Sequence, residues 1–402
     1  MKRLIFFVLI SLLFTTNTAH AAFVSGSTGA DGAFNPTANI EVALPANGIL
    51  NYTTVNIPST VTVTFKKNAA NTPVYMLATG DVTIAGTIKL DGASTIYTNP
   101  AITSPGVGGP GGYNGGYGGA TALPGGKGLG PGGGGGGPTS NYPYAGGGGF
   151  ATAGGSQGAN YGAGGSSYGN ARIIPLIGGS GGGGQAGSTS ASNYGGGGGG
   201  GAILIASSTT ITVTGTITAK GGDGYNGAGG GSGGAIRLIA NTISGNGTVS
   251  AKGGNISNTW KGGDGRIRLE ATTNNRTAGT DPVYTYGQPG TVFVANVPSL
   301  TITSIASVNV PASPTGSYAQ PDMLLPSTTT NPVTVNLSAA NIPVSTTVAV
   351  SVIPQYGSAT SVNATLTGTD SSSTGSARPA GGEGRASPEP RRRSWHAWAF
   401  PI

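Results

Sequence analysis

The sequence predicts an all-β protein: a right-handed parallel β-helix with a large glycine-rich insert, followed by a partial immunoglobulin-like β-sandwich. Three observations support this. Charged residues are only 8% of the chain and glycine is 78 of 402 residues, while each glycine inside a helix costs about 1 kcal/mol relative to alanine. Val, Ile and Thr fill the regular stretches, which favours strands. The third observation is an internal repeat with a period typical of solenoids.

Residues 1–21 are typical of a secretory signal peptide. Lys2 and Arg3 precede the apolar run Leu4–Phe14, which is too short to cross a bilayer comfortably, and small residues at 19 and 21 fit a cleavage site. We therefore predict a bacterial protein that is exported by the Sec route to the cell surface or beyond, with no transmembrane segment after cleavage. An uncleaved membrane anchor is the alternative.

Four sequence units share one plan and place β-helix coils in residues 22–92 and 201–297. Ile203–Gly221 recurs from Ile236 and again from Ile267, and Val74–Gly92 aligns with it without a gap at an offset of 129 residues. Alternation puts aliphatic side chains on one face of the unit and threonines on the other. The aliphatic set is Ile203, Ile205, Ile211, Val213 and Ile217, and the other set is Thr212, Thr214, Thr216 and Thr218.

One unit cannot bury its own apolar face, so we expect the units to stack with their strands paired in parallel. Three short strands are expected per unit: Ile203–Ile205, Ile211–Val213 and Thr216–Thr218 in the best copy. Stacking would place Ile203, Ile236 and Ile267 in neighbouring layers. Ile49–Lys67 is expected to supply earlier coils that begin or cap the stack.

Residues 93–200 form the glycine-rich insert, and 43 of the 78 glycines lie between positions 101 and 200. Two outcomes stay open: a flexible segment, or extended left-handed polyglycine helices that approach closely because side chains are absent. Arg172–Ile177 is the apolar patch of the insert, and it is a candidate strand or docking point. The surface-contact candidates are Tyr113, Tyr117, Tyr142, Tyr144, Tyr161, Tyr168 and Tyr194, which could also be apolar spacers.

Residues 298–377 are predicted to be the partial β-sandwich, because Val333–Leu337, Val348–Val352 and Val362–Leu366 alternate like strands. Residues 378–402 differ in composition from everything before them, and we predict an aberrant or disordered basic tail. A genuine basic and aromatic tail for a membrane surface or an acidic partner is the alternative. Because the two ends carry most of the net charge of +7, the body has no basic stripe for nucleic acid.

The segment GGGSGGAIRLIANTISGNGTVSAKGG at Gly229–Gly254 resembles a group of secreted, glycine-rich bacterial β-helix proteins. In that group, runs of glycine precede a strand and a threonine-rich coil. The resemblance covers roughly Asn51 to Ala271. It implies a parallel β-helix fold and a surface or adhesin-like role, and it carries over no catalytic residue.

The chain contains few of the residue types that common catalytic sites require. Cysteine is absent, and the two histidines are His20 and His396, one in the leader and one in the tail, so Ser-His-Asp and Cys-His arrangements and His/Cys zinc sites are excluded from the body. The motif Lys-Gly-Gly-Asp-Gly occurs twice, and its Asp223 and Asp264 could share a calcium ion with Asp91 if the turns stack. Asp-Gly as a tight turn is the simpler interpretation. No other cofactor is predicted.

We therefore predict an exported structural or adhesive protein of the cell surface, with a β-helix stalk and a contact region rich in glycine and tyrosine, and no enzymatic activity. Its expected partners are cell-surface or extracellular polymers, with polysaccharide as one candidate. Two alternatives remain: a polysaccharide-active β-helix lyase or hydrolase, and a non-catalytic carbohydrate-binding protein.

Overall fold

The computed structural model describes residues 22–96, 103–254, 259–311, 314, 318, 321–326 and 328–379, and the backbone of 397–398. The regular elements in these ranges are all β-strands, so the all-β class is confirmed. The predicted signal peptide and most of the predicted basic tail lie outside the described residues. Nowhere in the described ranges is there a helix that could cross a membrane.

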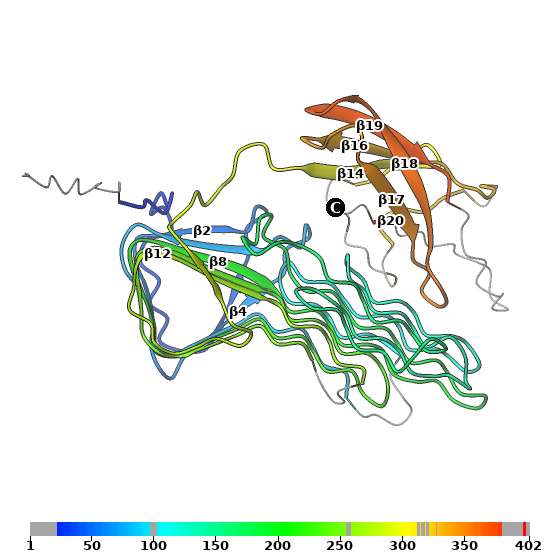
Figure 1. Ribbon diagram of the computed structural model, residues 1–402, viewed down its shortest axis with the longest axis horizontal. Helices are drawn as coiled ribbons and strands as arrows, with labels where there is room; N and C mark the ends of the chain where they lie inside the picture. Colours follow the sequence, from blue (N-terminus) through cyan, green and yellow to red (C-terminus); the bar gives the residue numbers. More distant parts are fainter. Residues whose placement is uncertain are drawn as a thin grey trace, which may run out of the picture.

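Two parallel sheets run through the first part of the chain, and the chain alternates between them (Figure 1). The first sheet contains β2 (Ile49–Tyr52), β3 (Val55–Ile57), β5 (Val74–Ala78), β6 (Val82–Ile84), β8 (Ala202–Val213), β10 (Ala235–Ser244), β12 (Arg266–Asn274) and β13 (Thr285–Gly287). The second contains β1 (Ile40–Ala43), β4 (Thr62–Lys66), β7 (Thr87–Lys89), β9 (Thr216–Thr218) and β11 (Thr248–Ser250). The sequence units that begin at Val74, Ile203 and Ile236 thus contribute strands to both sheets, whereas the unit that begins at Ile267 contributes strands to the first sheet only.

The register of the first sheet follows the sequence repeat. Ile203 pairs with Val74 on one side and with Ile236 on the other, and Ile236 pairs with Ile267. The predicted layering of the units is therefore confirmed. One detail differs: the first two strands expected in each unit merge into one long strand in β8, which pairs with both β5 and β6.

The aliphatic residues predicted to face inward form one buried cluster between the sheets. Ile203, Ile211 and Ile217 are fully buried, and Val55 and Phe65 of the upstream coils join the same cluster. A fully buried aliphatic side chain is worth about 1.5–3 kcal/mol, so this cluster is the main apolar contribution to the stack.

The outer face of the first sheet is also covered, which the alternation did not predict. Leu204 and Ile239 point outward from β8 and β10, and they pack with Phe150, Ile173 and Leu176 of the insert. The apolar patch Arg172–Ile177 is therefore a docking segment on this sheet, and it forms no strand.

In its described residues, 93–96 and 103–200, the glycine-rich insert adopts the second of the two expected outcomes, as extended segments that approach closely. Its segments contain almost no strand, yet their backbone N–H groups donate to neighbouring segments with a period of three residues. Residues 196 and 199 donate to one neighbour, 197 and 200 to a second, and 198 and 201 to a third. The pairs are Gly196 to Gly116, Gly199 to Tyr113, Gly197 to Gly229, Gly200 to Ser232, Gly198 to Ala93 and Gly201 to Leu90.

This pattern is that of extended helices with about three residues per turn, in which all hydrogen bonds go to other segments. Donors that point in three directions allow each segment to have neighbours on several sides, so the segments form a bundle. We call residues 90–96, 103–201, 219–234, 251–254 and 259–265 the glycine bundle. In Figure 1 it continues from the sheets as a layered set of cyan to green segments.

Close approach explains why these positions are glycine. A Cβ atom on Gly197 would lie 2.0 Å from the carbonyl oxygen of Gly222, and one on Gly199 would lie 2.0 Å from that of Gly179. Backbone atoms cannot move aside as flexible side chains can. Any side chain at these positions therefore separates the segments and breaks their hydrogen bonds.

The C-terminal part is one antiparallel sheet in the order β15-β14-β16-β19-β18-β17-β20. Its strands are β14 (Ser299–Ile305), β15 (Val308–Asn309), β16 (Val335–Ala340), β17 (Thr347–Val352), β18 (Thr360–Thr369), β19 (Ser372–Ala377) and β20 (Ala397–Trp398). Three of them match the strands expected from alternation, and they enclose a separate apolar core around Val335, Leu337 and Val350. The hydrogen bonds link all strands into one path and do not separate two sheets, so the partial immunoglobulin-like β-sandwich stays a prediction.

We predict that Gly197→Ala lowers the free energy of unfolding by about 2 kcal/mol or more, because the added methyl group overlaps a backbone oxygen. Gly279→Ala is the matched control, since a Cβ there meets nothing within 4 Å. It should change stability by less than about 1 kcal/mol. Thermal unfolding followed by circular dichroism measures both, and equal behaviour of the two variants would contradict the close-packed bundle.

Candidate functional site

Three of the predicted contact tyrosines meet at one end of the glycine bundle and form an aromatic cluster with Trp260. The rings of Tyr144 and Tyr161 are stacked with centroids 5.7 Å apart, and Tyr144 lies 4.7 Å from Trp260. Tyr142 packs edge-on against Tyr161 at 5.4 Å. We call Tyr142, Tyr144, Tyr161 and Trp260 the aromatic cluster.

The hydrogen bonds place this cluster away from the sheets. Gly201 leads directly into β8, so the segment that ends there begins at the far end of the bundle, about 20 Å away for an extended helix of this length. Gln185 donates to the carbonyl oxygen of Tyr194 at that far end, and the next residue, Ala186, donates to Pro143. Tyr144, which follows Pro143, is therefore at the far end too.

The other four predicted tyrosines have different surroundings. Tyr194 is buried against Tyr225 at 4.9 Å, and Tyr117 packs against Tyr318 of the C-terminal part at 5.5 Å. Burial raises the pKa of Tyr113 above its usual range. Among the seven predicted contact tyrosines only Tyr142 is exposed, at 41%.

Tyr168 is held inside the structure by its hydroxyl group, which donates to the carbonyl oxygen of Gly178 at 2.6 Å and accepts from Ser180 at 3.1 Å. Burial raises its pKa above the usual range. Its ring also packs on Phe150 with centroids 4.6 Å apart. Tyr168 is thus a structural residue of the covered sheet face. Of the seven tyrosines predicted to make a surface contact, those in the aromatic cluster remain candidates. Sequence reasoning missed Trp260, which lies directly before the second Lys-Gly-Gly-Asp-Gly motif, whereas Tyr225 lies directly after the first.

The three carboxylates considered for calcium are not gathered into one site. No group of three or more His, Cys, Asp or Glu side chains that could hold a metal occurs in the described part of the chain. Asp91 accepts from the backbone N–H of Lys220 at 2.7 Å, and Asp264 accepts from that of Gly253 at 3.3 Å. The backbone N–H of Asp223 donates to Ser94 at 2.9 Å. These contacts favour the turn interpretation.

A charged groove lies where the second sheet meets the glycine bundle. The cavity has a volume of about 960 Å³ and contains five lysines and three acidic residues. These are Lys66, Lys67, Lys89, Lys220 and Lys252 with Glu41, Asp91 and Asp223. Part of this charge is paired inside the protein: Lys89 lies 3.9 Å from Asp91, and Lys252 lies 3.0 Å from Asp281 just outside the groove. Burial lowers the pKa of Lys67 to about 8, and its ammonium group donates to the carbonyl oxygen of Gly112 at 3.2 Å.

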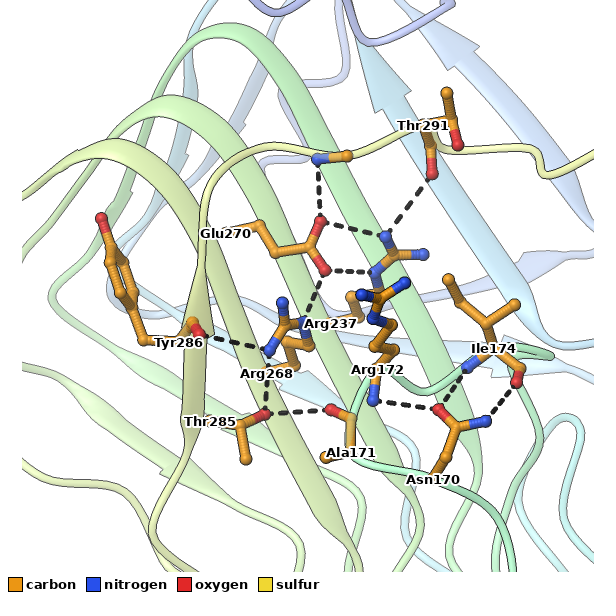
Figure 2. A network of polar contacts seen from close by, with 11 residues as sticks. Asn170, Ala171, Arg172, Ile174, Arg237, Arg268, Glu270, Thr285, Tyr286 and Thr291 are labelled. Atoms are coloured by element: carbon orange, nitrogen blue, oxygen red, sulfur yellow. Dashed lines mark hydrogen bonds and ion pairs between the residues drawn. The ribbon is translucent and has the colours of Figure 1, made fainter.

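A second polar site lies on the outer face of the first sheet (Figure 2). Arg237 of β10 and Glu270 of β12 form a two-pronged ion pair, with Nη2 to Oε2 at 3.0 Å and Nε to Oε1 at 3.2 Å, and both side chains are only 3% exposed. Arg268 adds a third contact at 2.7 Å from its Nε to Oε1. The backbone N–H of Gly290 donates to Oε2 at 3.1 Å.

The sequence repeat brings these groups together. Arg237 pairs in register with Arg268, and Ile239 pairs with Glu270, so the charges occupy adjacent outward positions on neighbouring strands. The aligned segments AIRLIA and RIRLEA contained this signal, because alternation places Arg268 and Glu270 on the same face. The network fastens the segment around Gly290 to the sheet.

Burial alone would raise the pKa of Glu270, but the net shift is downward. Hydrogen bonds and charge from Arg237 come next in importance, followed by hydrogen bonds from Arg268 and Gly290. The pKa of Glu270 is therefore lower than that of an ordinary glutamate, because the surrounding donors stabilise its charged form.

Comparison with known proteins gives no further guide to these sites: no family model, no curated protein and no solved structure matches the chain.

We predict that Glu270→Gln lowers the free energy of unfolding by about 3 kcal/mol at pH 7, because the buried guanidinium group of Arg237 and the partly buried one of Arg268 lose their counter-charge. The extra stability of the wild type over Glu270→Gln is complete above the pKa of about 4.3 that a glutamate has in the unfolded chain. It declines as the pH falls through the lower pKa of Glu270 in the folded protein. Denaturant unfolding at pH 7 and pH 3 should therefore show a smaller difference between the variants at pH 3. Exposed Glu41 provides the control variant Glu41→Gln, and an equally large effect there would contradict the role of the network.

Proposed function

We propose that this protein is an exported structural or adhesive component of the bacterial cell surface, which contacts an extracellular polymer through the aromatic cluster at the end of its glycine bundle. The two parallel sheets act as the stalk of one right-handed parallel β-helix. The glycine bundle is a rigid platform that projects from it, and the C-terminal part is a spacer or attachment module.

The alternation of the chain between two sheets in register supports the solenoid. The layers that begin with β5, β8 and β10 each add strands to both sheets, and their aliphatic residues share one buried cluster. Such a column resists extension because its strands share one continuous core. These are the properties that a stalk requires.

The order of the glycine bundle supports a contact role. A flexible glycine-rich segment would lose conformational entropy when it binds, and this loss would weaken binding. Here hydrogen bonds between segments fix the backbone before any partner arrives. Aromatic rings on such a support bind without that cost.

The aromatic cluster is the single observation that carries the proposal. Tyr142 is 41% exposed, and Tyr144, Tyr161 and Trp260 extend its apolar surface beside it. Aromatic rings with a polar edge suit surfaces that are apolar on one side and hydrated on the other, as sugar rings in a polysaccharide are. We therefore assign the contact to a polysaccharide rather than to a charged polymer.

We predict that Tyr142→Ser weakens binding to the partner polysaccharide about tenfold, as expected for the loss of a central aromatic contact. The measurement is retention of purified protein on a glycan array and on insoluble cellulose and chitin. Tyr286→Ser is the matched control, since Tyr286 is 45% exposed and lies on β13 outside the cluster. Equal retention of the wild type and Tyr142→Ser on every glycan, or no retention of either, would contradict the proposal.

A further inference from the structure

We propose that the outer face of the first sheet contains a binding site for an oxyanion, formed by Arg172, Arg237 and Arg268. The three arginines line a cavity of about 810 Å³ together with Glu270. Its remaining walls come from the segment at Asn170–Ile174 and from Gln288, Gly290, Thr291 and Val294. This site is separate from the aromatic cluster and does not depend on the proposed adhesive role.

The carboxylate in the cavity is fully engaged inside the protein. Oε1 of Glu270 accepts from Arg237 and Arg268, and Oε2 accepts from Arg237 and the backbone N–H of Gly290. Four donors saturate the hydrogen-bonding capacity of one carboxylate. Glu270 therefore has no free acceptor position for a further arginine.

Positive charge remains uncompensated. Three guanidinium groups and one carboxylate line the cavity, so the net charge of these four side chains is positive. Arg237 is 3% exposed and Arg268 is 14% exposed, so water screens their excess charge poorly. Unpaired charge in such a position is costly, and an anion that enters the cavity would offset that cost.

Arg172 is the donor best placed to receive a ligand. It is exposed, and within the described residues its guanidinium group makes no ion pair. Figure 2 shows its side chain extending towards the guanidinium group of Arg237. Two like charges that point towards one another repel. An anion bound between them attracts both guanidinium groups and so outweighs their mutual repulsion.

The backbone around Arg172 is fixed in advance. The side-chain oxygen of Asn170 accepts from the backbone N–H of Arg172 at 3.0 Å, and its amide group donates to the carbonyl oxygen of Ile174 at 2.6 Å. The hydroxyl group of Thr285 donates to the carbonyl oxygen of Ala171 at 3.0 Å and so ties this turn to β13. Binding at this position therefore orders the Arg172 side chain but requires little further ordering of the backbone.

The ligand chemistry follows from the donors. Guanidinium groups match the two oxygens of a carboxylate or of a phosphate through paired hydrogen bonds. Ile174 and Val294 add apolar wall next to the charges, which suits an oxyanion attached to a small organic body. Acidic sugars and sugar phosphates share this chemistry.

Calorimetric titration of the full chain without its leader tests the site, with sodium glucuronate, inorganic phosphate and glucose as separate probes. We expect heat of binding with one or both anions and none with glucose. Binding of glucuronate alone assigns the site to a carboxylate, and binding of phosphate alone assigns it to a phosphate. Arg172→Gln should lower the affinity for whichever anion binds by about tenfold. Arg172→Lys keeps the charge, and it should lose less affinity than Arg172→Gln does.

The exposed Arg378 lies outside the cavity, so Arg378→Gln is the control and should bind as the wild type does. Circular dichroism of each variant shows whether the fold is retained, and Arg172 is suited to this test because its side chain is exposed. The absence of binding of either anion to the wild type would overturn the proposal. So would binding that is equal in the wild type and a folded Arg172→Gln variant.

Discussion

Hydrogen bonds between backbones that have no side chains to separate them are the constraint on which the rest of this structure depends. Gly197 donates to Gly229, and a single methyl group on Gly197 would overlap the carbonyl oxygen of Gly222. Glycine is usually a poor choice for ordered structure, because it loses the most conformational entropy on folding. In this bundle that loss is offset by donors that point in three directions, so that one segment is bonded to several others.

The sheets and the bundle are continuous with one another. Gly201 donates to Leu90 just before β8 begins, and Ala235 donates back to Gly201 as β10 begins. The layers of the sheets therefore set the layers of the bundle, and the aliphatic core holds the positions from which the glycine segments start. This explains how a segment with so little apolar surface can be ordered: the register of the sheets holds its ends in alignment. It also explains why aromatic residues that are distant in sequence, such as Tyr144 and Trp260, meet at the far end.

The outer face of the first sheet shows how one repeat can supply two kinds of surface. Towards β8 it is apolar and covered by Ile173 and Leu176, while towards β12 it carries Arg237, Arg268 and Glu270. The buried ion pair fastens the segment at Gly290 and leaves an excess of positive charge beside it. The aromatic cluster and this basic cavity lie on different parts of the molecule. The two proposals, adhesion and oxyanion binding, can therefore stand or fall separately.

Local sequence determined the strands, their inward and outward faces and their layering, because alternation and the internal repeat constrain each residue relative to its neighbours. Ile203, Ile236 and Ile267 lie in adjacent layers for that reason. Only the tertiary structure decided between a flexible and an ordered insert, since glycine runs have no periodicity of side chains from which contacts can be inferred. Tertiary structure also selected Tyr142, Tyr144 and Tyr161 from seven similar tyrosines and added Trp260 to them. Which segments become neighbours in the bundle depends on hydrogen bonds across many residues, and that information is absent from any single stretch of the chain.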